Sequence, residues 1–130
     1  MDVIKTEKAA LPGGWYSQAY KVGDLIYTAG ITGTDPVTQE LIGPNDIVAQ
    51  TRAIMENMEI ILQEAGSDMK HVFKTLVFVK NIDEFEKFNE VYMEYFPENP
   101  PARSTMQVGK FNNGMAIEIE AIAEVVKEEE

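Results

Sequence analysis

Hydrophobic residues recur at helical spacing in two segments of the chain. Between residues 46 and 65, one apolar stripe repeats every third or fourth position, and Gly66 is a natural stop. A second, aromatic stripe begins near Asp83 and Glu86, which have the spacing of a capping pair, and the helix is expected to end at Pro97. The first stripe comprises Ile47, Thr51, Ile54, Met55, Met58, Ile61, Leu62 and Ala65, and the second Phe85, Phe88, Tyr92, Tyr95 and Phe96. Both predict amphipathic helices that bury one face.

Alternating or β-branched segments predict strands elsewhere. The expected strands cover residues 3–6, 16–22, 25–29, 72–80, 102–108 and 115–125. Gly23-Asp24 provides a hairpin turn between the second and third strands, and Asn112-Asn113-Gly114 has hairpin turn chemistry between the last two. In the last strand, apolar residues occupy one face, and Glu118, Glu120 and Glu124 share the other.

This order of elements predicts one domain over residues 1–130, of the α+β class. Two amphipathic helices need one sheet face to cover, so a two-layer sandwich is expected. Apolar positions on the opposite sheet face indicate self-association into a symmetric oligomer with a sheet-lined interface. The connection from Gly30 to Asn45 is long for a compact domain and is a candidate for function.

The residue inventory excludes several kinds of chemistry. The chain has no cysteine, which rules out disulfides, thiolate metal sites and cysteine nucleophiles. His71 is the single histidine, so a multi-histidine metal site is excluded, and a serine–histidine triad would have to use this residue. Because His71 lies where a loop enters a strand and lacks an evident partner, we interpret it as an ordinary, partly exposed side chain.

The formal net charge of −11 bears on the partners of this protein. A strongly acidic chain disfavours nucleic acids and anionic membranes, because both are usually bound through basic surfaces. The terminal Lys127-Glu128-Glu129-Glu130 run is expected to be a solvated tail. No apolar run approaches transmembrane length and no secretory segment opens the chain, so the cytoplasm is the expected location.

Arg103 is the first candidate for chemistry. The chain has only two arginines, Arg52 and Arg103, against nine lysines. Arg103 follows Pro100-Pro101 at the start of an expected strand, and a rigidly held guanidinium suits bidentate capture of a carboxylate. The alternative is a surface ion pair with a neighbouring glutamate.

Glu118 is the second candidate. It lies either on a solvated face with Glu120 and Glu124, or in a pocket where desolvation would raise its pKa and suit it to proton transfer. A tight turn at Asn113-Gly114 would pair Arg103 with Glu124 instead. A partnership of Arg103 with Glu118 would therefore need a longer loop, a diagonal approach or a second subunit.

Two further polar residues stand out from their surroundings. Tyr16 follows the Gly13-Gly14 pair and either opens a strand or offers a phenol to a ligand. Asn89 lies among apolar neighbours on the second expected helix, and its amide needs hydrogen-bond partners if it is buried.

Together these residues resemble the signature of the RidA/YjgF family, the reactive intermediate deaminases, some of which carry the older label L-PSP endoribonuclease. The resemblance extends over nearly the whole chain and includes the separation between Arg103 and Glu118. The matching segments are Tyr27-Thr28-Ala29-Gly30, Asp35-Pro36-Val37-Thr38, residues 49–52, Phe78-Val79-Lys80, Phe85 to Asn89, Pro101-Ala102-Arg103-Ser104 and residues 117–123.

The resemblance implies a chorismate-mutase-like fold assembled as a homotrimer, with ligand clefts between subunits. It further implies hydrolysis of imines and enamines, such as 2-aminoacrylate, to 2-keto acids and ammonia, with no metal or organic cofactor. By this resemblance Arg103 would hold the substrate carboxylate, and Glu118 would position or activate water. The remaining expected substrate-binding positions are Tyr16, Gly30, Asn89 and Thr105, the last at a place often occupied by cysteine.

One segment departs from the family pattern. Many deaminating members follow the glycine with glutamine, isoleucine and proline, whereas this chain reads Gly30-Ile31-Thr32-Gly33. This difference concerns the shape of the substrate pocket and leaves Arg103 in place. Two alternatives therefore stand beside the hydrolase: a trimer that binds small carboxylates or acts as a chaperone without turnover, and a single-strand endoribonuclease.

Overall fold

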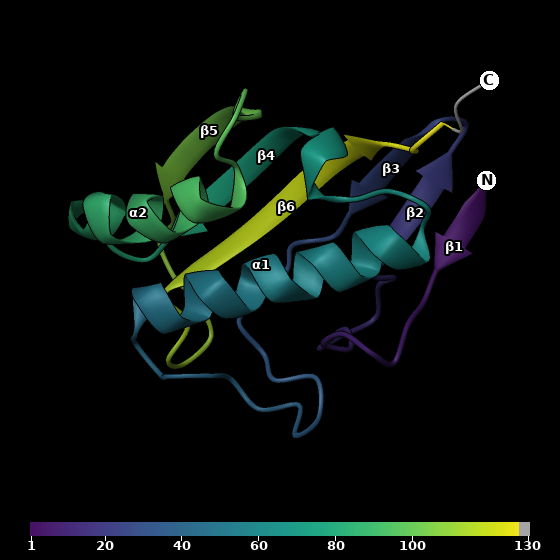
Figure 1. The fold of residues 1–130 in the computed structure, drawn as a ribbon. Helices are drawn as coiled ribbons and strands as arrows, with labels where there is room; N and C mark the ends of the chain where they lie inside the picture. Colours follow the sequence, from purple (N-terminus) through teal and green to yellow (C-terminus); the bar gives the residue numbers. More distant parts are fainter. Residues whose placement is uncertain (128–130) are drawn as a thin grey trace.

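A computed structural model describes residues 1–127 as one mixed sheet with two helices on one of its faces (Figure 1). Of the expected tail at residues 127–130, residues 128–130 lie outside the described residues. The strands are β1 (Asp2–Ile4), β2 (Ala19–Val22), β3 (Leu25–Thr28), β4 (Val72–Val79), β5 (Ala102–Gln107) and β6 (Ile117–Glu124). The helices are α1 (Ile47–Glu64) and α2 (Phe85–Tyr95), with short 3₁₀ turns η1 (Met69–His71) and η2 (Ile82–Glu84). The α+β two-layer prediction is confirmed.

Helix α1 follows its sequence pattern closely. Asp46 caps the N-terminus by accepting a hydrogen bond from the backbone N–H of Ala49. All members of the predicted stripe are buried, and Gly66 after the helix has a φ of +89°. The stripe therefore forms the core between α1 and the sheet.

The start of α2 differs from the prediction. Asp83 does not cap this helix, because residues 82–84 form the 3₁₀ turn η2 and the helix itself begins at Phe85. Asn81 caps η2 by accepting a hydrogen bond from the Asp83 N–H at 3.0 Å. The aromatic stripe is confirmed, since Phe88, Tyr92 and Phe96 belong to the core and Phe85 and Tyr95 pack against it.

The sheet order is β1-β2-β3-β6-β4-β5, and only the β4–β5 pair is parallel. The Gly23-Asp24 hairpin is confirmed by the pairing of Val22 with Leu25. The predicted hairpin between the last two strands is wrong, because β4 lies between β5 and β6. The physical reason is the β4-α2-β5 crossover, which makes β5 parallel to β4 and leaves the other edge of β4 for β6.

Consequently, Arg103 does not pair with Glu124. Arg103 pairs with Thr75 of β4, and Glu124 pairs with Leu25 of β3. The last two expected strands are also shorter than predicted, and residues 108–116 form a connection that crosses the end of β4.

The two faces of the sheet differ in character. The face under the helices is apolar and fully buried at Ile26, Val77 and Ile119. Neither helix covers the opposite face (Figure 1). This open face carries Tyr20 and Tyr27, which are 39% and 44% exposed, together with the partly buried side chains of Leu76, Phe78, Glu118, Glu120 and Ile122. Among the described residues, neither helix has the length and apolar composition needed to cross a bilayer.

Candidate functional site

Arg103 is held beneath α2 at the edge of the sheet. Its partner in β4 is Thr75, a buried residue of the helix-covered face, so the Arg103 side chain lies on that face. Nη1 of Arg103 donates a 2.8 Å hydrogen bond to Oδ1 of Asn89 on α2. The guanidinium carbon lies 5.2, 5.2 and 4.7 Å from the ring centroids of Phe85, Phe88 and Tyr92. Three aromatic rings and one amide thus fix the position of this cation.

No carboxylate within residues 1–127 forms an ion pair with Arg103. The alternative for Arg103 is a surface ion pair with a glutamate. The structure shows such a pair at Arg52, with Glu94. Both Arg52 amino groups donate to the carboxylate of Glu94, at 3.1 and 3.2 Å, and this bidentate bond raises the Arg52 pKa. Arg103 is therefore positioned by neutral groups and retains its charge for an external anion.

Tyr92 and Thr75 both lie next to Arg103, Tyr92 through its ring and Thr75 as the paired residue of β4. The Tyr92 hydroxyl lies 2.7 Å from Oγ1 of Thr75, and both residues are buried. Burial raises the Tyr92 pKa, and the Thr75 hydrogen bond and the Arg103 charge oppose that shift in part. The phenol therefore stays neutral at physiological pH and acts as a wall and hydrogen-bonding group.

Thr105 follows Arg103 by two residues on β5 and pairs with Val77, so its side chain shares the same face. Its Oγ1 is buried and has no hydrogen-bond partner within residues 1–127. A buried hydroxyl without a partner is costly, so this one offers hydrogen-bonding capacity beside the cation. We call Arg103, Asn89 and Thr105 the guanidinium cluster.

Glu118 lies on the open face of the sheet, opposite Phe78 of β4. Its carboxyl group is half-buried, and this burial, reinforced by the negative charge of Glu120, raises the Glu118 pKa. Gly30 lies directly against it, since a Cβ added at Gly30 would overlap the Glu118 carboxylate. Of the two alternatives for Glu118, the structure supports the partly desolvated one.

A cavity of about 840 Å³ adjoins Glu118. Tyr16 and Gly30 line this cavity together with Glu118. Tyr16 does not open a strand, because β2 starts at Ala19, and its hydroxyl accepts a hydrogen bond from the Gly13 N–H at 3.2 Å. We call Tyr16, Gly30 and Glu118 the carboxylate cluster.

The six predicted site residues therefore form two clusters rather than one. Arg103 lies on the helix-covered face of the sheet, whereas Glu118 lies on the open face, with β4 between their strands. Neither a longer loop nor a diagonal approach within one chain can bring them together across the sheet. Only the third route, a second subunit, remains open.

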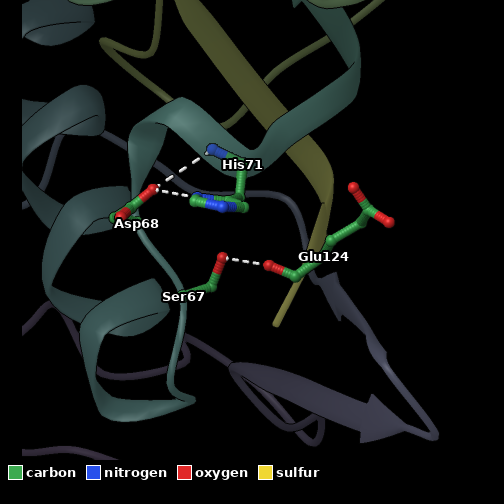
Figure 2. A network of polar contacts seen from close by, with 4 residues as sticks. All are labelled: Ser67, Asp68, His71 and Glu124. Atoms are coloured by element: carbon green, nitrogen blue, oxygen red, sulfur yellow. Dashed lines mark hydrogen bonds and ion pairs between the residues drawn. The ribbon is translucent and has the colours of Figure 1, made fainter. Parts of the chain in front are cut away.

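His71 takes part in a local structure away from both clusters. Its Nδ1 lies 2.6 Å from Oδ1 of Asp68, which also accepts the His71 backbone N–H at 3.2 Å, as Figure 2 shows. In the same view, Ser67 donates its hydroxyl hydrogen bond to the backbone carbonyl of Glu124. Asp68 therefore caps the η1 turn and is the partner of His71, so the expectation that this histidine lacks a partner is wrong. Within residues 1–127, no group of three or more acidic or histidine side chains is placed to hold a metal ion.

Comparisons with known proteins identify the family to which the chain belongs. The family model described as "Endoribonuclease L-PSP" matches residues 6–125. A curated "RutC family protein" from Pyrococcus abyssi is 47% identical over 122 residues, which are 94% of this chain and 95% of that protein. This chain belongs to the RidA/YjgF family.

Two further RidA/YjgF members carry more specific names. "Reactive Intermediate Deaminase A, chloroplastic" from Arabidopsis thaliana is 38% identical over 94% of this chain and 65% of that protein. The crystal structure of RidA from the Antarctic bacterium Psychrobacter sp. PAMC 21119 is 36% identical, with a TM-score of 0.92 over 96% of this chain and 100% of that one. The fold is therefore that of the RidA/YjgF family, and the family includes reactive intermediate deaminases.

The sequence pattern does not indicate which residues hold the Arg103 guanidinium. Helical spacing predicts only a core role for Phe85, Phe88 and Tyr92, yet their rings also surround the guanidinium. A signal did exist, because three aromatic residues at helical spacing precede a strand that opens with an arginine. In this chain, the same helical spacing places the three rings both at the core and around Arg103.

Proposed function

We propose that this RidA/YjgF protein hydrolyses reactive 2-imino and enamine acids, such as 2-aminoacrylate, to 2-keto acids and ammonia. The observation that carries the proposal is the state of Arg103, a cation fixed by neutral groups and free of any carboxylate within residues 1–127. Such a group suits the carboxylate that every 2-imino acid carries. Family membership, with a reactive intermediate deaminase among the relatives, supports the same reaction class.

The proposed assembly is a homotrimer in which the guanidinium cluster of one subunit faces the carboxylate cluster of the next. Two observations support it. The clusters occupy opposite faces of one sheet, so a complete site requires a second copy of the chain. The open face also exposes apolar residues, including Tyr20 and Tyr27, and such a face favours association.

The chemistry needs few groups. A proton from solvent adds to the enamine carbon and gives an iminium, and water adds to its C2 carbon while the Glu118 carboxylate accepts a proton from that water. The tetrahedral product then loses ammonia as the C–N bond breaks and the C=O bond forms. Glu118 passes its proton to the leaving nitrogen, and the hydroxyl proton of the tetrahedral product returns to solvent. One enamine acid and one water thus yield one 2-keto acid and one ammonia. A partly buried carboxyl with a raised pKa suits both proton transfers.

The test generates 2-aminoacrylate with a pyridoxal-phosphate dehydratase acting on serine and follows pyruvate formation with and without this protein. The parent protein should accelerate pyruvate release. Arg103→Ala should lower kcat/KM by about 100-fold or more, because a bidentate charge-assisted contact and the orientation that it provides are both lost. Arg52→Ala is the matched control, since Arg52 pairs with Glu94 away from both clusters, and it should retain the parent rate.

Three outcomes would overturn the proposal. The first is no acceleration by the parent protein, and the second is an Arg103→Ala rate equal to that of the parent. The third comes from the same preparations incubated with single-stranded RNA, where cleavage that depends on Arg103 would favour the endoribonuclease. Binding of pyruvate without hydrolysis of 2-aminoacrylate would instead favour the non-catalytic trimer.

A further inference from the structure

We propose that the paired hydroxyls of Thr32 and Thr34 select substrates whose side chain carries an uncharged hydrogen-bonding group, such as a hydroxyl or a carboxamide. Both threonines line the same cavity as Glu118 and Gly30. Thr32 belongs to the Gly30-Ile31-Thr32-Gly33 segment, in which this chain departs from the family pattern, and Thr34 follows that segment directly. The inference rests on the proposed function, because it names the class of imino acid taken by the same site.

The hydroxyl pair retains hydrogen-bonding capacity. Oγ1 of Thr32 and Oγ1 of Thr34 lie 2.8 Å apart, so one hydroxyl donates to the other. Each hydroxyl has one donor and two acceptor lone pairs. No other hydrogen bond to either hydroxyl occurs within residues 1–127, so one O–H and several lone pairs remain available to a molecule in the cavity.

The backbone that carries this pair is held firmly against α1. The side-chain amide of Asn57, a buried residue of α1, donates to the carbonyls of Thr32 at 3.4 Å and Thr34 at 2.8 Å. Between them, Gly33 packs so closely that an added Cβ would lie 2.8 Å from the Cα of Gln50. The two hydroxyls are therefore preorganised, which lowers the entropic cost of recognising a ligand.

The other cavity walls determine which side chain fits. Glu118 is the charged side chain that lines the cavity within residues 1–127. Besides the two threonines and the Tyr16 phenol, the polar lining consists of the neutral side chains of Gln39, Asn112 and Asn113. A negatively charged substrate side chain would be repelled by Glu118, and among residues 1–127 no carboxylate other than Glu118 lines the cavity to pair with a positive one. In a single chain the cavity measures about 840 Å³, so the walls that this chain contributes do not restrict the substrate to the methylene of 2-aminoacrylate.

The experiment compares two imines of nearly equal shape. An L-amino-acid oxidase forms them from L-asparagine and L-leucine. The asparagine side chain ends in a carboxamide, and the leucine side chain ends in an isopropyl group of nearly the same shape. Semicarbazide traps the remaining imine, and the peroxide released by the oxidase normalises the supply. The measured quantity is the ratio of kcat/KM for the asparagine imine to that for the leucine imine. The parent protein should prefer the asparagine imine.

Removing either hydroxyl should lower that ratio. Thr32→Val and Thr34→Val are nearly isosteric, and each should reduce the ratio by about tenfold, as expected for one lost hydrogen bond. Thr32→Ser keeps the hydroxyl and should restore the parent ratio. Thr38→Val is the matched control, because Thr38 is exposed on the same connection and does not line the cavity.

The outcomes separate this inference from the proposed function. If the parent hydrolyses 2-aminoacrylate but shows no preference for the asparagine imine, the inference is wrong and the hydrolase stands. The same holds if both valine variants lose activity on the two imines equally, since that result indicates a purely structural role. If the parent hydrolyses no imine at all, both proposals fail together.

Discussion

At the scale of single residues, Glu118 lies in an environment that is unfavourable for a charged carboxylate. Its carboxyl is half-buried, Glu120 lies on the same face of β6, and within residues 1–127 it has no cationic partner. Each of these features disfavours the charged form, so the Glu118 pKa lies above its ordinary value. An environment that disfavours the charged form of its own carboxyl group is a local conflict of the kind found at functional sites.

We therefore expect Glu118→Gln to raise the thermal stability of the protein at neutral pH. In the unfolded chain Glu118 titrates near the ordinary value of about 4.3, whereas its folded-state pKa is higher. Between the two pKa values the folded state binds more protons, so stability falls as pH rises through this interval. The glutamine variant avoids that loss. Its advantage in Tm should be full above the folded-state pKa and should vanish below about pH 4.

The measurement is Tm against pH at a fixed protein concentration, because association also affects Tm. Glu124→Gln is the matched control on the same strand, since the Glu124 side chain is exposed, and it should show little pH-dependent gain. A glutamine variant at position 118 that is less stable than the parent at neutral pH would contradict the assigned environment.

At the scale of elements, periodicity predicted what lies on each face but not which strands are neighbours. The α1 stripe is correct because helical spacing depends only on residues a few positions apart. The β5–β6 hairpin is wrong because Asn112-Asn113-Gly114 has suitable turn chemistry but the adjacent edge of β4 is available to β6. Strand order depends on contacts between distant segments, which a local pattern does not record.

The candidate site shows the same division. Residue type and family pattern identified Arg103 and Glu118, and the structure gives each a distinctive environment. Their placement on opposite faces depends on the register through β4. Arg103 pairs with Thr75, which in turn pairs with Ala121 of β6. Ala121 and Glu118 face opposite ways, because side chains alternate along a strand. Thr32 is visible in the sequence only as part of a departure from a motif, and Thr34 gives no signal there, because the role of both depends on which loops meet around the cavity.

A prediction at this scale concerns the close approach of the chain after β3 to β6. In Gly30→Ala, the new methyl group would overlap the Glu118 carboxylate, which must then move. We expect kcat/KM for 2-aminoacrylate to fall by about 100-fold, the loss typical of a catalytic group displaced by about 1 Å. Because the clash involves the end of a flexible side chain, the fold should be retained, as circular dichroism would show.

Gly13→Ala is the matched control for this substitution. Gly13 lines the same cavity, but an added Cβ there would meet no heavy atom within 4 Å. This variant should retain most of the parent activity. If Gly30→Ala were as active as Gly13→Ala, then Glu118 would not act from the position that the structure gives it.

At the scale of the whole molecule, the proposed homotrimer would account for both the open sheet face and the divided site. A chain with exposed Tyr20 and Tyr27 on a sheet face gains free energy by covering them with a second copy. The same association is what the proposed site needs, because Arg103 and Glu118 cannot meet within one chain. In the proposed trimer, folding, assembly and catalysis therefore depend on one interface.

This arrangement makes a quantitative prediction about mixed oligomers. Arg103→Ala and Glu118→Gln should each be nearly inactive alone, since each lacks one half of every site. When the two variants are unfolded together in equal amounts and refolded, a site is complete where an intact Glu118 from one variant meets an intact Arg103 from the other. Random cyclic assembly gives this combination at about one quarter of the sites, so about a quarter of the parent activity should return.

Mixing without unfolding is the control, because subunits that do not exchange should stay inactive. Refolding each variant separately tests for gains unrelated to assembly. If co-refolded mixtures that form mixed oligomers, as shown by native mass spectrometry, remained inactive, Arg103 and Glu118 would have to act from the same chain. The sheet separates these two residues within one chain, so that result would show that the site is not built from the two clusters.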